Sequence, residues 1–107
     1  MTITNYGVFF SIHRPSYTND LLDQQQVEKA KVAIEALFKK RKTINTRIGS
    51  SYSLKHECER YLRKNGFEGS NYIGNGACIQ AMIDLGYTMK ANSDTQPNAY
   101  FNVARDT

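Results

Sequence analysis

The chain has 107 residues, of which 40% are hydrophobic and 11% aromatic, and its net charge is +4. This length supports one hydrophobic core and excludes two, so we predict a single domain over residues 1–107. No apolar run approaches the roughly 18 residues of a membrane span, and the opening MTITNYGVFFSIHRP lacks the basic leader and cleavage site of a signal peptide. The expected location is the cytoplasm.

The positive charge is concentrated in one part of the chain. Residues 39–64 contain nine lysines and arginines and two glutamates, a net charge of +7 that leaves −3 for the remaining residues. This asymmetry favours an anionic partner, either nucleic acid or an acidic protein surface. A solvated helix end and a solvated helix face would explain the same charges.

The N-terminal third predicts a strand and a long helix. Residues 6–12, YGVFFSI, are aromatic and β-branched, which favours a short strand that Pro15 ends. From residue 21 to about residue 42, apolar residues recur at spacings of three and four, so we predict a helix capped by Asn19 or Asp20. The run KKRK would then lie at the negative pole of the helix dipole.

The remaining elements predict the fold class. After a polar connector, SYSLKHECERYLRK predicts a second helix, which a serine can cap and Asn65-Gly66 ends. A third helix is expected from Asn75 to Leu85, and YTMK and AYFNV flank a turn-rich loop as in a β-hairpin. The predicted fold is α+β and winged-helix-like, with three helices, a C-terminal β-hairpin and an N-terminal strand.

The third predicted helix, NGACIQAMIDL, is apolar around almost its whole circumference. Its polar residues are Asn75, Gln80 and Asp84. Such a helix is generally buried, whereas a recognition helix in a DNA groove presents donors and cations outward. We therefore expect this helix to be part of the core and not to read a base sequence.

Cations outside that helix are the predicted contacts to nucleic acid. Contacts of this kind hold phosphates and position a protein without reading sequence. The predicted nucleic-acid-binding residues are Lys39, Lys40, Arg41, Lys42, Arg47, Lys55, Arg63 and Lys64.

No catalytic or metal-binding motif stands out. His56 and Cys58 are two residues apart on a predicted helix and therefore point about 200° apart, so they cannot share a metal ion. We expect Cys58 and Cys78 to be free, buried thiols. The segment GSNYIGNG lacks the lysine of a P-loop, and turn formation with Asn75 as a helix cap explains it more simply. We predict no enzyme activity, no metal and no cofactor.

Five aromatic residues alternate along the predicted strands. They are Phe9, Phe10, Tyr87, Tyr100 and Phe101. On an exposed sheet face they could stack single-stranded bases, but packing on the helices and in cross-strand pairs is the favoured interpretation. The sequence leaves open whether the chain forms a homodimer through this sheet edge.

Three segments, SSYSLKHECERYL, YIGNGACIQAMIDLGY and NAYFNV, resemble small proteins encoded by phages, prophages and plasmids. That group has a serine-rich start followed by LKH and a glutamate, a helix of the pattern Y..NG..I.A....G, and a closing NAYFN. The resemblance covers about residues 47–103. It implies a mobile-element origin and a bacterial cytoplasm, and it carries no catalytic residue across.

The sequence therefore predicts a small mobile-element protein that binds nucleic acid through a basic helix surface. The alternative is a phage accessory protein that binds and modulates a host protein complex, for example in defence or replication. The two hypotheses differ in salt dependence, because phosphate binding weakens steeply as ionic strength rises and an apolar protein interface does not.

Overall fold

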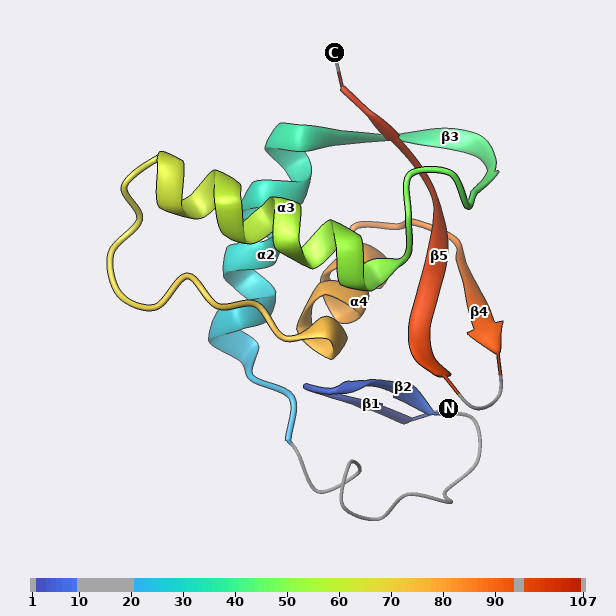
Figure 1. Cartoon of the computed structure of the whole chain (residues 1–107), viewed down its shortest axis with the longest axis horizontal. Helices are drawn as coiled ribbons and strands as arrows, with labels where there is room; N and C mark the ends of the chain where they lie inside the picture. Colours follow the sequence, from blue (N-terminus) through green and yellow to red (C-terminus); the bar gives the residue numbers. More distant parts are fainter. Residues whose placement is uncertain (1, 10–20, 94–95, 107) are drawn as a thin grey trace.

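The computed structural model describes residues 2–9, 21–93 and 96–106. Figure 1 shows the helices gathered on one side of an antiparallel sheet, with a short hairpin beneath them. The helices of the described residues are α2 (Gln24–Leu37), α3 (Ser51–Lys64) and α4 (Asn75–Asp84). The strands are β1 (Thr2–Thr4), β2 (Gly7–Phe9), β3 (Phe38–Asn45), β4 (Met89–Ser93) and β5 (Gln96–Arg105). The fold class is α+β, as predicted.

Local signals in the sequence explain where α2 and α3 begin and end. Asp23 caps α2 by accepting hydrogen bonds from the backbone N–H groups of the next turn, so the predicted caps at 19 and 20, outside the described residues, are not required. Ser50 caps α3 by accepting from the N–H of Tyr52 at 3.3 Å. Beyond Lys64, Gly66 has a φ of +70°, a conformation that glycine adopts without strain. The predicted second helix is therefore confirmed.

The predicted helix over residues 21–42 is wrong in its last part. The helix α2 ends at Leu37, and the backbone of Phe38 is already extended, with φ −132° and ψ 162°. Phe38 is buried and pairs with Arg105 of β5. Pairing with β5 and burial of Phe38 outweigh the helical pattern of the sequence. The KKRK run consequently lies on a strand, and the helix-dipole interpretation of it does not apply.

The structure contains the predicted C-terminal hairpin and strands that the sequence did not predict. The C-terminal hairpin is confirmed as β4 paired with β5, and β3 pairs with the other edge of β5, giving the strand order β3-β5-β4. At the N-terminus the structure has a hairpin of β1 and β2 instead of a single strand, with Ile3 opposite Val8. Residues 10–12 of the predicted strand lie outside the described residues. The order α2-β3-α3-α4-β4-β5 is consistent with a winged-helix arrangement.

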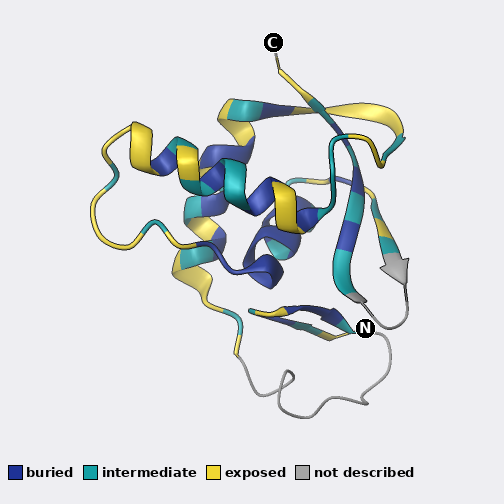
Figure 2. Cartoon of the chain, in the orientation of Figure 1, coloured by how far each residue is buried: buried dark blue, intermediate teal, exposed yellow. Residues whose placement is uncertain are grey.

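The helix α4 lies at the centre of the core, as its apolar pattern predicts. Its first eight residues are all buried except Gln80, which is partly buried (Figure 2). The side chains of Gln80 and Asp84 hydrogen-bond to each other at 2.7 Å. At Gly76 a Cβ atom would lie 1.4 Å from the carbonyl oxygen of Thr4, so only glycine lets the β1–β2 hairpin contact the helix this closely.

Candidate functional site

Four consecutive cations lie exposed on the edge strand β3. Successive side chains of a strand point to opposite faces, so these cations project from both faces of β3. They are Lys39, Lys40, Arg41 and Lys42. Among the described strands β3 pairs with β5 alone, and Figure 2 shows this stretch of β3 as exposed. Arg41 donates from Nη2 to the Thr43 hydroxyl at 2.8 Å. None of the four has a carboxylate of the described chain within ion-pairing distance. The strand therefore presents uncompensated positive charge.

The other predicted phosphate contacts fall into two places. Arg47 is exposed in the turn that follows β3. Arg63 and Lys64 are exposed in the last turn of α3, which Figure 1 places at the opposite side of the molecule from the free end of β3. The structure thus brings Arg47 close to the β3 cations along the chain and separates Arg63 and Lys64 from them.

Lys55 does not lie on an exposed helix face, and that prediction is wrong. The residue is only 5% exposed. Its Nζ lies 3.4 Å from Glu59 Oε2 and 4.5 Å from the centre of the Tyr72 ring. Tyr72 belongs to the linker between α3 and α4, residues 65–74. A second ring, that of Tyr52, lies 5.5 Å away. Lys55 is removed from the set of phosphate contacts because its ammonium group is already paired and flanked by aromatic rings.

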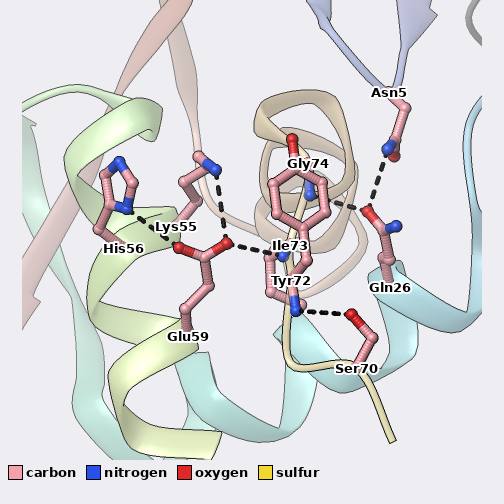
Figure 3. Close-up of polar contacts among 9 residues, drawn as sticks. All are labelled: Asn5, Gln26, Lys55, His56, Glu59, Ser70, Tyr72, Ile73 and Gly74. Atoms are coloured by element: carbon pink, nitrogen blue, oxygen red, sulfur yellow. Dashed lines mark hydrogen bonds and ion pairs between the residues drawn. The ribbon is translucent and has the colours of Figure 1, made fainter. Parts of the chain in front are cut away.

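The carboxylate of Glu59 connects α3 to the linker (Figure 3). Its Oε2 atom accepts a hydrogen bond from the Ile73 N–H at 2.9 Å as well as from Lys55. Its Oε1 atom lies 3.0 Å from His56 Nδ1. Glu59 therefore fixes the ring of His56, the ammonium of Lys55 and the backbone next to Tyr72 in one arrangement.

Gln26 of α2 holds the same linker from the other side. Its Oε1 atom accepts from the Gly74 N–H at 2.8 Å and from Asn5 Nδ2 at 3.0 Å (Figure 3). Two helices thus hold consecutive residues of the linker, and one of them also holds the turn between β1 and β2.

Asn75 joins four parts of the chain and is not the helix cap that the sequence suggested. The cap of α4 is Gly74, which makes no side-chain hydrogen bond. The Asn75 side chain accepts from the Ser51 hydroxyl at 2.6 Å and donates to the Tyr6 carbonyl at 3.1 Å and to Asn98 Oδ1 at 2.9 Å. These bonds satisfy a buried carboxamide, and they fix α3, the N-terminal hairpin and β5 around the start of α4.

An open pocket of about 610 Å³ lies between these segments. Its walls come from the β1–β2 turn, α3, the linker, the first residue of α4 and the start of β5. Its volume is within the usual range for small-molecule sites. Its lining includes the side chains of Tyr52, Lys55, His56, Tyr72, Asn75 and Asn98.

We did not predict this pocket from the sequence, although a signal was present. The segments that resemble mobile-element proteins contain LKH with a following glutamate, the Y..NG pattern and the NAYFN end. Lys55, His56, Tyr72, Asn75 and Asn98 come from these three segments, and all five line the pocket. The three segments thus contain the pocket residues, but their spacing along the chain did not indicate that these residues lie close together in the fold.

The cysteines are free and buried, as predicted. A hydrogen bond with Cys78 and burial raise the pKa of the Cys58 thiol well above its usual range. Cys58 is therefore a core thiol and not an activated nucleophile. No group of three or more metal-ligating side chains occurs within residues 2–9, 21–93 and 96–106.

The sheet aromatics mainly pack inward. Tyr87 is 8% exposed and Phe101 is fully buried, in agreement with the favoured interpretation of the sequence. Phe10 lies outside the described residues. The exposed aromatic residues of the described chain are instead Tyr6, Tyr52 and Tyr72, and all three line the pocket.

No helix of the described part of the chain is long and apolar enough to cross a membrane. No family model, curated protein or solved structure matches this chain. The resemblance to mobile-element proteins therefore stays a prediction.

Proposed function

We infer that this protein binds nucleic acid, in a bacterial cytoplasm and as a mobile-element protein, mainly through phosphate contacts made by β3. The observation that carries the proposal is the run of exposed cations from Lys39 to Lys42, none of which is neutralised by a carboxylate of the described residues. Exposed cations without a carboxylate partner among the described residues also occur on α3, at Arg60, Arg63 and Lys64, but in β3 four of them follow one another along one edge of the sheet.

The proposed binding does not depend on sequence. The helix that would enter a DNA groove in a winged-helix protein, α4, is buried, and its polar side chains Gln80 and Asp84 bond to each other. Cations on an extended strand stand about 6.7 Å apart on each face, a spacing that lets them contact successive phosphates. We assign Arg47 to the same surface because it follows β3 and is exposed.

The test is fluorescence anisotropy with labelled single-stranded and duplex DNA and RNA at 50 and 200 mM salt. If four cations contact phosphates, the affinity for duplex DNA falls about 100-fold between these concentrations. In one variant Lys39, Lys40 and Lys42 are changed to glutamine, which should weaken binding and reduce the salt dependence.

A charge-matched control variant locates the surface. It carries Arg60→Gln, Arg63→Gln and Lys64→Gln, three exposed cations on α3. We expect this variant to keep most of the affinity. Equal losses of affinity in the two variants would show that binding depends on the net charge of the protein and not on the β3 cations. Absence of binding at 50 mM salt by the folded protein would contradict the proposal and favour the alternative, a host-protein partner.

A further inference from the structure

The pocket beside Lys55 has walls that are held in place before any ligand arrives. Glu59 and Gln26 fix the linker that carries Tyr72, and Asn75 fixes the β1–β2 turn and the start of β5. Preorganised walls reduce the entropy lost on binding. The side chains at the mouth, Tyr52 and Tyr72, are 52% and 54% exposed, so their rings remain accessible to a ligand.

Charge in the pocket argues against a charged ligand. The ammonium of Lys55 lies between the rings of Tyr52 and Tyr72, in the place that a cationic ligand of an aromatic cage would take. Glu59 compensates that ammonium at 3.4 Å, which also weakens any attraction for an anion. A ligand held by the rings is therefore expected to be neutral at the part that enters the pocket.

Polar groups remain available at the pocket wall. The Nδ1 atom of His56 faces Glu59, and its Nε2 atom bonds to no described residue. Asn98 uses Oδ1 to accept from Asn75, while its Nδ2 group has no acceptor among the residues that the structure describes. The hydroxyl groups of Tyr52 and Tyr72 are likewise unbonded within the described chain. Both hydrogen-bond donors and acceptors are thus presented beside aromatic rings.

We propose that this pocket binds a nucleobase, which stacks on Tyr72 or Tyr52 and is hydrogen-bonded along its edge by His56 and Asn98. A nucleobase is neutral and planar, and it carries donors and acceptors around its edge. The base comes either from a free nucleotide or from an unstacked residue of a single strand. The pocket shares no residue with the β3 cations, so this inference does not depend on the phosphate binding proposed above.

The experiment records ¹H–¹⁵N NMR spectra of the full chain during titration with AMP, GMP, CMP and UMP, and separately with short single-stranded DNA and RNA. The expected result is saturable shifts of the Ile73 and Gly74 amides with a Kd below about 1 mM for at least one ligand. Saturation by mononucleotides identifies a free nucleotide as sufficient. Saturation only by oligonucleotides identifies a base in a strand. Both results support the proposal, whereas absence of saturation by every ligand overturns it.

Variants of the exposed ring separate stacking from simple contact. We expect Tyr72→Ala and Tyr72→Leu to weaken binding about 5- to 150-fold and Tyr72→Phe to keep it. Tyr100→Ala, outside the pocket, is the matched control and should bind as the unchanged chain does. Equal affinity of the Tyr72→Ala and unchanged proteins overturns the proposal. The β3 glutamine variant should still bind mononucleotides, so failure of one proposal does not imply failure of the other.

Discussion

The pair of Lys55 and Glu59 allows a stringent test of the site geometry. We consider Glu59→Gln, which keeps the shape of the side chain and one carbonyl oxygen but removes the charge. The side chains of Lys55 and Glu59 are 6% and 14% exposed, so the ammonium would lose its carboxylate in a place that water scarcely reaches. Breaking a buried pair in this way costs about 3–5 kcal/mol. We expect a loss near the lower limit, about 3 kcal/mol, because the pair is partly open to the pocket.

The matched control is Glu57→Gln on the same helix. The Glu57 side chain is 15% exposed, about as buried as that of Glu59, but its partner Arg105 is 53% exposed, so water solvates the guanidinium once the carboxylate charge is removed. We therefore expect the small loss of a solvent-exposed pair, about 0–1 kcal/mol. Urea unfolding followed by circular dichroism gives both free energies. A difference of less than about 1 kcal/mol between the unfolding free energies of the two variants would contradict a buried Lys55–Glu59 pair.

A second-site change identifies the cause of the loss. In the double variant Lys55→Met/Glu59→Gln, the buried charge is gone, and a side chain of similar length fills its space. We expect this variant to be more stable than Glu59→Gln alone by about 1–3 kcal/mol, since the two residues are in contact and their effects are not additive. If the double variant instead loses the sum of the stabilities lost by Lys55→Met and by Glu59→Gln, Glu59 acts mainly through its hydrogen bond with the Ile73 N–H.

Three further predictions concern the core. Ser51→Ala should cost about 1–3 kcal/mol in urea unfolding, because the hydroxyl donates to Asn75 and accepts from the Ala99 N–H; a neutral effect would contradict these bonds. Gly76→Ala should cost at least about 3 kcal/mol, because the added Cβ would clash with the Thr4 carbonyl. Gly66→Ala should cost about 1 kcal/mol, since open space surrounds this glycine and only its backbone conformation is unfavourable for alanine. Equal losses would contradict the close contact between the β1–β2 hairpin and α4. The raised pKa of Cys58 means that the folded chain holds the thiol proton more tightly, so stability should fall as pH rises above about 9.0, less steeply in Cys58→Ala. An identical pH profile for both proteins would count against a buried thiol.

The helices could be predicted because their signals are local. The apolar residues of α3 recur at helical spacing between a serine cap and Asn65-Gly66, and the almost entirely apolar pattern of α4 predicted its burial. The strand β3 could not be predicted in this way. Its lysines are compatible with a helix, and only the pairing of residues 38–45 with partners 56 or more residues further along the chain makes them a sheet edge.

The pocket was missed for a related reason. A lysine followed four residues later by a glutamate predicts an ordinary surface pair on a helix. That Lys55 is buried depends on Tyr72, which reaches it because the linker is held by Glu59 and Gln26. Hydrogen bonds between a side chain and a distant backbone N–H leave no periodic pattern in a sequence.

The hydrogen bonds of Asn75 also bear on the order in which the chain folds. They join residues that are 22 to 69 positions apart, and each one closes a loop whose entropy must be lost before the bond can form. The bond to the Tyr6 carbonyl in the N-terminal hairpin spans 69 positions, whereas the bonds to Ser51, Pro97 and Asn98 span 22 to 24. We therefore expect the N-terminal hairpin to dock after the folding transition state. Substitutions at its contact with Asn75 should then speed unfolding and leave the refolding rate nearly unchanged.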